Sequence, residues 1–178
     1  MIPTKKQALK ILDQYDLPEP VIKHSLLVCE VSDFIGQKMI TNGQNVELEK
    51  LKAAAILLDL DKAIVGSDYK KHGHVAAQIL SKKGMSEIAP LVKKHWVGNI
   101  GTSDLNPQTI EEKILFYADK ITSTKIVSLE ERGFSWLKKL PGKKDRILRN
   151  LSLVGKLEEE ILSLAKITFK DIEQHFNS

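Results

Sequence analysis

The residues of this sequence best suited to chemistry are histidines and aspartates on the apolar faces of predicted helices. They are His24, Asp59, His72, His95 and Asp119. Each has apolar neighbours three or four residues away on the same helical face, so all five are expected to enter one core. A lone inward histidine is more often a core residue than a ligand, but imidazoles and carboxylates together suit Mn, Fe, Co, Ni or Zn. The sequence therefore predicts a divalent metal site.

Asp59 is the central residue of this set. It ends the apolar run of residues 53–58, where a buried carboxylate is costly unless a cation or a metal ion pairs with it. Lys62 comes three residues later and points roughly the same way if the helical turn continues. We therefore expect Asp59 and Lys62 to face the same pocket.

Three further ionisable residues are left outside the predicted site. Helical geometry turns Asp61 away from Asp59, and it turns His74 about 200° around its helix from His72, toward water. His175 falls in a C-terminus that we expect to be frayed.

The helical spacing of apolar residues continues through nearly the whole chain, and no segment alternates convincingly as a strand does. Thr4 is predicted to cap the first helix and Ser86 the fifth. The longest break lies at residues 98–107. The predicted helices cover about residues 4–15, 20–40, 47–60, 67–83, a segment that starts at Ser86, 108–128, 130–140 and 144–169. We therefore predict an all-α bundle of about seven or eight helices.

Composition limits the function classes. The 178 residues suit a single domain spanning residues 1–178, and they contain no apolar run long enough to cross a membrane. The 27 basic and 23 acidic residues are mixed and leave a net charge of +4, and no nucleic-acid-binding signature accompanies them, so we do not expect a nucleic-acid partner. Cys29 is the only cysteine, which excludes an internal disulfide and predicts a cytoplasmic protein.

The order of the candidate ligands resembles that of the HD-domain metal-dependent phosphohydrolases, in particular small HDIG-type proteins. The resemblance rests on His24, the run Ala-Ala-Ile-Leu-Leu-Asp-Leu-Asp-Lys that ends at Lys62, the segment that begins His72-Gly-His, His95, and the run Lys-Ile-Leu-Phe-Tyr-Ala-Asp-Lys-Ile that contains Asp119. It covers about residues 4–126 and implies an all-helical core, to which residues 130–170 add a helical extension.

The resemblance also implies how the ligands divide. His24, Asp59 and Asp119 match the ligands of one metal ion. In branches that hold two ions, the residue matching Asp59 bridges to a second ion, whose histidines match His72 and His95. The number of ions and their identity, with Mg added to the metals named above, stay open.

Leu58 departs from the family pattern. It stands where the family has the histidine of its HD doublet, and leucine cannot bind a metal. The site is therefore predicted to be partly degenerate, with two alternatives. Either three protein ligands and water still support catalysis, or the chain is a catalytically inactive HD domain that acts as a ligand-binding or regulatory module.

The expected activity is metal-dependent hydrolysis of a phosphoester in a small anionic substrate such as a nucleotide. Asp59 would be the shared ligand, and Asp119 would position or deprotonate the attacking water. Lys62 would offset the charge of the phosphate, and Lys120 and Lys125 are weaker candidates for the same substrate-binding role.

The last predicted helix carries an apolar stripe of Leu148, Leu151, Val154 and Leu157. Such a stripe most often packs on its own domain, and the alternative is a homodimer formed through this helix. Trp136, in the preceding helix, is expected to be a core or interface aromatic rather than a stacking platform.

Overall fold

The computed structural model describes residues 1–66, 68, 70–102 and 104–177. Within these residues the chain forms ten α-helices and two short 3-10 helices, with one isolated antiparallel bridge between Thr122 and Ile126. The all-α prediction is confirmed, although the chain divides into more helices than the seven or eight expected. The elements are α1 (Lys5–Leu12), α2 (Glu19–Thr41), α3 (Leu48–Leu57), α4 (Lys62–Val65), α5 (His74–Lys82), α6 (Ala89–Lys94), η1 (Val97–Asn99), α7 (Ile110–Ile121), α8 (Leu129–Lys139), η2 (Pro141–Lys143), α9 (Lys144–Ala165) and α10 (Phe169–Asn177).

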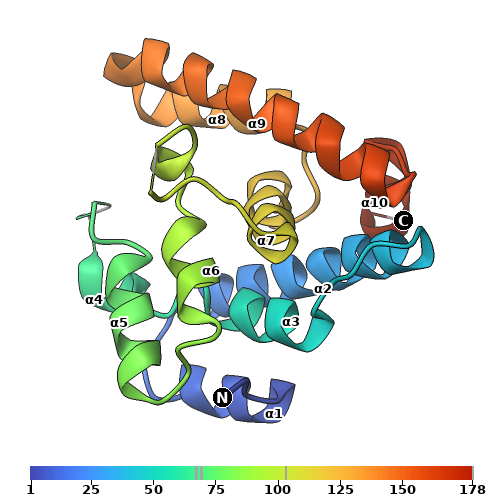
Figure 1. The fold of residues 1–178 in the computed structure, drawn as a ribbon. Coiled ribbons are helices and arrows are strands. Elements are labelled where there is room, and N and C mark those ends of the chain that lie inside the picture. The colour runs from blue at the N-terminus through green and yellow to red at the C-terminus, as the bar shows by residue number, and fades with distance from the viewer. Residues whose placement is uncertain (67, 69, 103, 178) are drawn as a thin grey trace.

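Helices α2, α3 and α7 form the centre of the fold, with α9 across one side and α1 at the opposite end (Figure 1). The end of α3 is apolar on every side, and residues 53–58 are all buried. A helix of this kind has to be surrounded, and α1, α2, α6 and α7 pack against it. Asp59 therefore begins its turn in the interior of the protein. None of the helices in the described residues is both long enough and apolar enough to cross a membrane.

The two predicted caps have different outcomes. Thr4 caps α1 as predicted, because its hydroxyl accepts a hydrogen bond from the Gln7 backbone N–H at 3.3 Å while the Gln7 side chain accepts one from Thr4 N at 2.8 Å. The prediction for Ser86 is wrong, since α6 begins only at Ala89. A separate turn precedes α6, closed by the bond from Ile88 N to the carbonyl of Met85.

The helix predicted for residues 67–83 starts later than expected. Ser67 itself lies outside the described residues, and α5 begins at His74. The Asp61 carboxylate fixes this start, because its Oδ2 accepts hydrogen bonds from the backbone N–H groups of Gly73 (2.8 Å) and Ala76 (3.0 Å). An acceptor from outside the helix thus satisfies N–H groups that the first turn leaves without partners.

The helix predicted for residues 108–128 ends at Ile121. The guanidinium of Arg132 binds carbonyl groups at the end of α7 and just after it. Its Nε donates to Lys120 O at 2.7 Å, and its Nη2 donates to Asp119 O at 3.2 Å and to Thr122 O. Thr122 is extended and pairs with Ile126. The chain therefore turns back, and α8 begins at Leu129 next to the end of α7.

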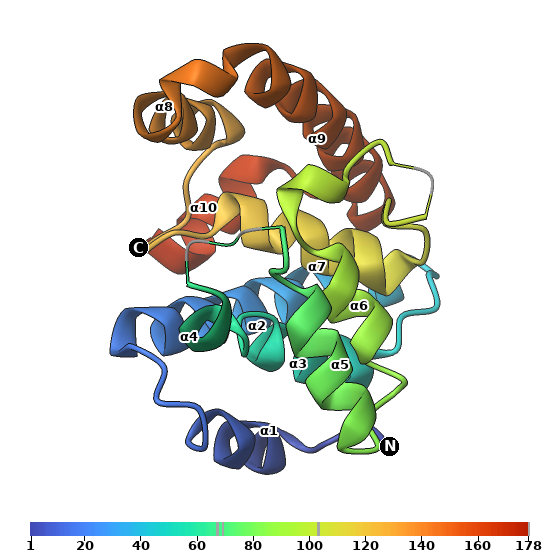
Figure 2. The ribbon, with the colours of Figure 1, turned by 90° about the vertical axis from the view of Figure 1, so that its left-hand side faces the viewer.

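The helix predicted for residues 144–169 is two helices. Lys166 adopts a left-handed conformation (φ +50°) and ends α9, after which α10 lies between the α8–α9 pair and α2 (Figure 2). His175 is not frayed, because its ring stacks on Phe34 of α2 with centroids 4.6 Å apart. Val154 and Leu157 of the apolar stripe are buried within this chain, whereas Leu148 stays 46% exposed.

Candidate metal centre

Asp59, His72 and His95 bring three ligand atoms to one point. The Oδ1 atom of Asp59 lies 3.3 Å from His72 Nε2 and 3.7 Å from His95 Nε2, and the two Nε2 atoms are 3.0 Å apart. All three side chains are buried, and their ligand atoms lie within 4.8 Å of one another. They come from the turn after α3, the turn before α5 and the end of α6.

Hydrogen bonds behind the two imidazoles fix the direction of their Nε2 atoms. His72 Nδ1 is 2.7 Å from Asp61 Oδ1, and His95 Nδ1 is 2.6 Å from the carbonyl of Val92. Because both partners are acceptors, each Nδ1 carries a hydrogen and donates it. In the neutral tautomers, both Nε2 lone pairs then face each other, an arrangement that a shared cation stabilises. These residues therefore fit a divalent metal ion.

Without a metal ion, His72 itself carries the positive charge at this point, because its imidazole is protonated. Burial alone would lower the pKa of His72, but the bonds to the carboxylates of Asp59 and Asp61 prevail and raise it to about 9. Burial lowers the pKa of His95. Burial opposes ionisation of Asp59 as well, but the two imidazoles and the ammonium of Lys62 lower the pKa of Asp59. Protonated His72 thus donates to neutral His95 and to the carboxylates.

This arrangement predicts a pH dependence for the metal-free protein. The folded-state pKa of His72 lies above its ordinary value of 6.5, so its protonation stabilises the fold fully below about pH 6.5, and that stabilisation disappears as the pH rises through about 9. In EDTA, the free energy of unfolding should fall by up to about 3 kcal/mol across this window. Urea titrations at intervals between pH 6.5 and 9 measure it. The His72→Gln variant should remove most of the slope, and an unchanged slope would contradict this assignment.

His24 and Asp119 lie beside the three ligands and face two lysines. His24 Nε2 is 2.9 Å from Asp119 Oδ1 and 3.7 Å from Asp59 Oδ2. Lys62 Nζ lies 2.7 Å from Asp59 Oδ2, and the Lys120 ammonium pairs with Asp119. Two ammonium groups therefore already balance the carboxylates on this side of the pocket.

Lys120 is held inside the protein. Its ammonium also donates to the carbonyl of His95 at 2.8 Å, and the residue is buried, which lowers its pKa. It ties α7 to the end of α6 and so helps to position His95. Lys62, by contrast, is 40% exposed at its side chain and reaches the pocket from the solvent side.

One pocket with a volume of about 240 Å³ contains all five predicted metal ligands. Lys62 and Lys120 belong to its lining, whereas Lys125 is exposed and does not. Leu58 is fully buried in the core and supplies no ligand atom. The lining residues are His24, Asp59, Lys62, His72, His95, Trp96, Val97, Asp119, Lys120, Arg132 and Trp136.

Sequence reasoning missed three contributors. Asp61, which was predicted to be turned away from Asp59 and was left outside the site, is fully buried and holds both His72 and the start of α5. The helical rotation assumed for it does not apply, because α3 ends at Leu57. Arg132 and Trp136 reach the pocket only because the chain turns back after α7. No spacing in the sequence signals that turn.

Comparison with known proteins gives one match. The family model of the HD domain matches residues 21–124, which is more than half of the chain and includes His24, Asp59, His72, His95 and Asp119. Neither a curated protein nor a solved structure matches the chain. Arg132 and Trp136 lie beyond the matched residues.

Proposed function

This chain belongs to the HD-domain family, a family of metal-dependent phosphohydrolases, and we propose that it hydrolyses a phosphoester in a small anionic substrate such as a nucleotide. The observation that carries this proposal is the convergence of Asp59, His72 and His95, whose imidazoles are locked with both Nε2 atoms facing one point. A divalent ion held there would supply a bound water of lowered pKa as the nucleophile.

The pocket residues around the three ligands suit a phosphate group. Burial opposes the charge on Lys62, but the carboxylate of Asp59 raises the pKa of Lys62, so its ammonium stays charged. It pairs with Asp59 at 2.7 Å on the solvent side of the pocket, from which a phosphate would enter. Burial opposes ionisation of Asp119, but Lys120 and His24 hold its pKa well below the ordinary value. Such a carboxylate is a weak base, and we therefore assign Asp119 to orienting the attacking water rather than to deprotonating it.

Two tryptophans add aromatic surface to the pocket. Trp96 and Trp136 both belong to the lining of the pocket and are partly exposed there. A guanidinium lies over each ring, that of Arg146 over Trp96 at 5.4 Å and that of Arg132 over Trp136 at 6.0 Å, so a nucleobase would have to displace one of them in order to stack. Arg132 lines the same side and adds a second positive charge beyond Lys62.

The test is phosphate release from a panel of nucleoside mono-, di- and triphosphates by protein loaded in turn with Mn, Fe, Co, Ni, Zn or Mg. We expect release with at least one metal, and a decrease on the order of 100-fold or more in the His72→Gln variant, which lacks one ligand. Release that persists undiminished in the variant would come from another protein and would contradict the proposal.

Leu58 favours a second function, that of an inactive HD domain that binds a ligand. A leucine at the doublet position removes a ligand that the family pattern provides, and it is fully buried here. The Leu58→His variant separates the two functions. If the parent neither binds metal nor releases phosphate while the variant does both, the binding function stands; activity in the parent supports the hydrolase.

A further inference from the structure

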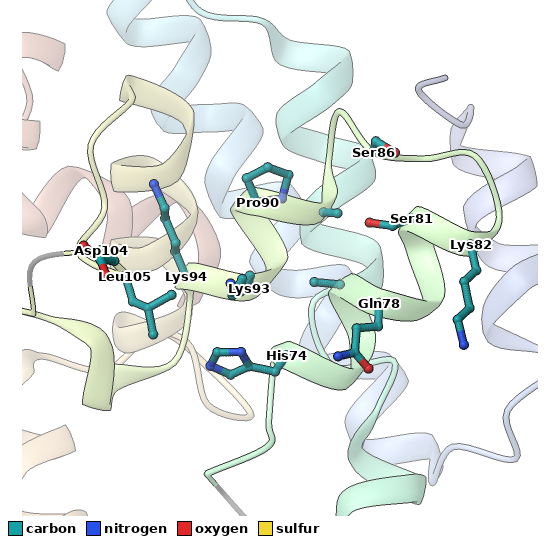
Figure 3. Close-up of a pocket in the computed structure, with 12 residues that line it drawn as sticks. His74, Gln78, Ser81, Lys82, Ser86, Pro90, Lys93, Lys94, Asp104 and Leu105 are labelled. Carbon is teal, nitrogen blue, oxygen red and sulfur yellow. The ribbon is translucent and has the colours of Figure 1, made fainter.

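A second and larger pocket lies between α5, α6 and residues 104–105, which follow η1 (Figure 3). Its volume is about 600 Å³, which lies within the range typical of small-molecule sites. No residue of its lining is shared with the metal pocket. His74 follows His72 by two residues but points into this second pocket.

The second pocket is basic. Lys82 on α5 and Lys93 and Lys94 on α6 line it, against one acidic lining residue, Asp104. Lys94 donates to Glu112 Oε2 at 2.8 Å and is therefore neutralised in place. Within the described residues, neither Lys82 nor Lys93 makes an ion pair. The pocket thus carries uncompensated positive charge on both of its helical walls.

Its remaining surface combines an apolar floor with neutral hydrogen-bonding groups. The floor consists of the buried Ala77 and Ala89, and the more exposed Pro90 and Leu105 add apolar surface at the sides. The neutral polar residues are Gln78, Ser81 and Ser86. A ligand with an apolar or ring-shaped body and separated negative groups complements both features.

Close contacts hold α5, α6 and η1 together around this pocket. Gly73 lets α5 approach the end of α6 closely, since a Cβ at this position would lie 3.0 Å from the carbonyl oxygen of Val92. Asn99 Nδ2 donates to the carbonyl of Lys93 at 3.1 Å, and the Asn106 side chain accepts from Gly101 N at 2.9 Å. The Asn99 contact joins η1 to the end of α6, so the position of η1 beside α6 does not depend on a ligand.

We propose that the second pocket binds a small organic phosphate, with its apolar body on the floor and its phosphate groups against Lys93 and Lys82. Lysine binds phosphate as a point charge, and ammonium groups spread along a groove match a chain of phosphates better than a single carboxylate. This site does not depend on the proposed function, because it shares no residue with the metal pocket.

Calorimetry of ATP binding to metal-free protein in EDTA tests the proposal. We expect saturable binding that the Lys82→Gln/Lys93→Gln double variant weakens about tenfold or more. Lys83→Gln is the matched control, because it removes a lysine next to Lys82 that does not line the pocket. Lys62→Gln reports any ATP that binds in the metal pocket instead, since Lys62 lines that pocket and not this one. Inorganic triphosphate should bind more weakly than ATP, because it cannot use the apolar floor.

Three results would overturn the proposal. They are the absence of ATP binding to the parent, equal binding by the parent and the double variant, and a loss of binding confined to Lys62→Gln. The assay needs neither a metal ion nor turnover, so its failure is distinct from a failure to find phosphohydrolase activity.

Discussion

The Asp59→Asn variant is expected to lose metal binding, and with it the proposed hydrolysis, by a factor on the order of 10³ or more. The substitution keeps the shape of the side chain but removes the only negative charge among the three converging ligands. It also leaves the buried His72 and the ammonium of Lys62 without the carboxylate that pairs with both. Elemental analysis after metal loading and kcat/KM for phosphate release measure the two losses, with circular dichroism to show that the variant is folded.

Asp61→Asn is the matched control for this substitution. Both carboxylates are buried, they stand two residues apart, and both contact His72, but Asp61 bonds the far nitrogen of the ring. A group that orients a ligand without touching the metal typically contributes about 10- to 100-fold in metal affinity. The expected order is therefore a near-complete loss for Asp59→Asn and a partial loss for Asp61→Asn. Equal losses would contradict the assignment of Asp59 as the ligand and Asp61 as its support.

The sequence predicted the all-α class and placed the five candidate ligands in one pocket, because most of them stand on or directly after regular helices. Asp119 lies within α7, and His95 directly follows α6. The apolar residues three and four positions away therefore predicted correctly that both side chains face the interior. The family pattern added the order of these residues along the chain.

The same reasoning failed wherever a helix ended without a signal. Asp61 follows the end of α3, so its direction depends on a turn and on the N–H groups of Gly73 and Ala76, which are distant in sequence. Lys166 ends α9 in a left-handed conformation that glycine usually adopts. Tertiary contacts determine the conformation of the chain at Asp61 and at Lys166. The spacing of apolar residues along one helix does not predict such contacts.

Gly73→Ala is expected to destabilise the protein strongly although Gly73 is not a ligand. Gly73 has a φ of +79°, which is unfavourable for alanine, and the new Cβ would lie 3.0 Å from Val92 O and 3.1 Å from Lys93 O. Those oxygens belong to backbone and cannot rotate away, so α5 and α6 would have to separate. We expect a decrease of about 2 to 4 kcal/mol in the free energy of unfolding, measured by urea denaturation.

Gly84→Ala supplies the matched control for Gly73→Ala. It has the same φ of +79°, but no atom lies within 4 Å of its Cβ position. Its free energy of unfolding should therefore decrease only by the cost of placing alanine in this backbone conformation, about 1 kcal/mol. The additional loss of stability in Gly73→Ala measures the close contact between α5 and α6 that holds His72 near His95. Metal affinity should fall as well, because the two Nε2 atoms, which are 3.0 Å apart, would separate. Equal destabilisation by the two variants would show that the α5–α6 contact does not hold the two histidines together.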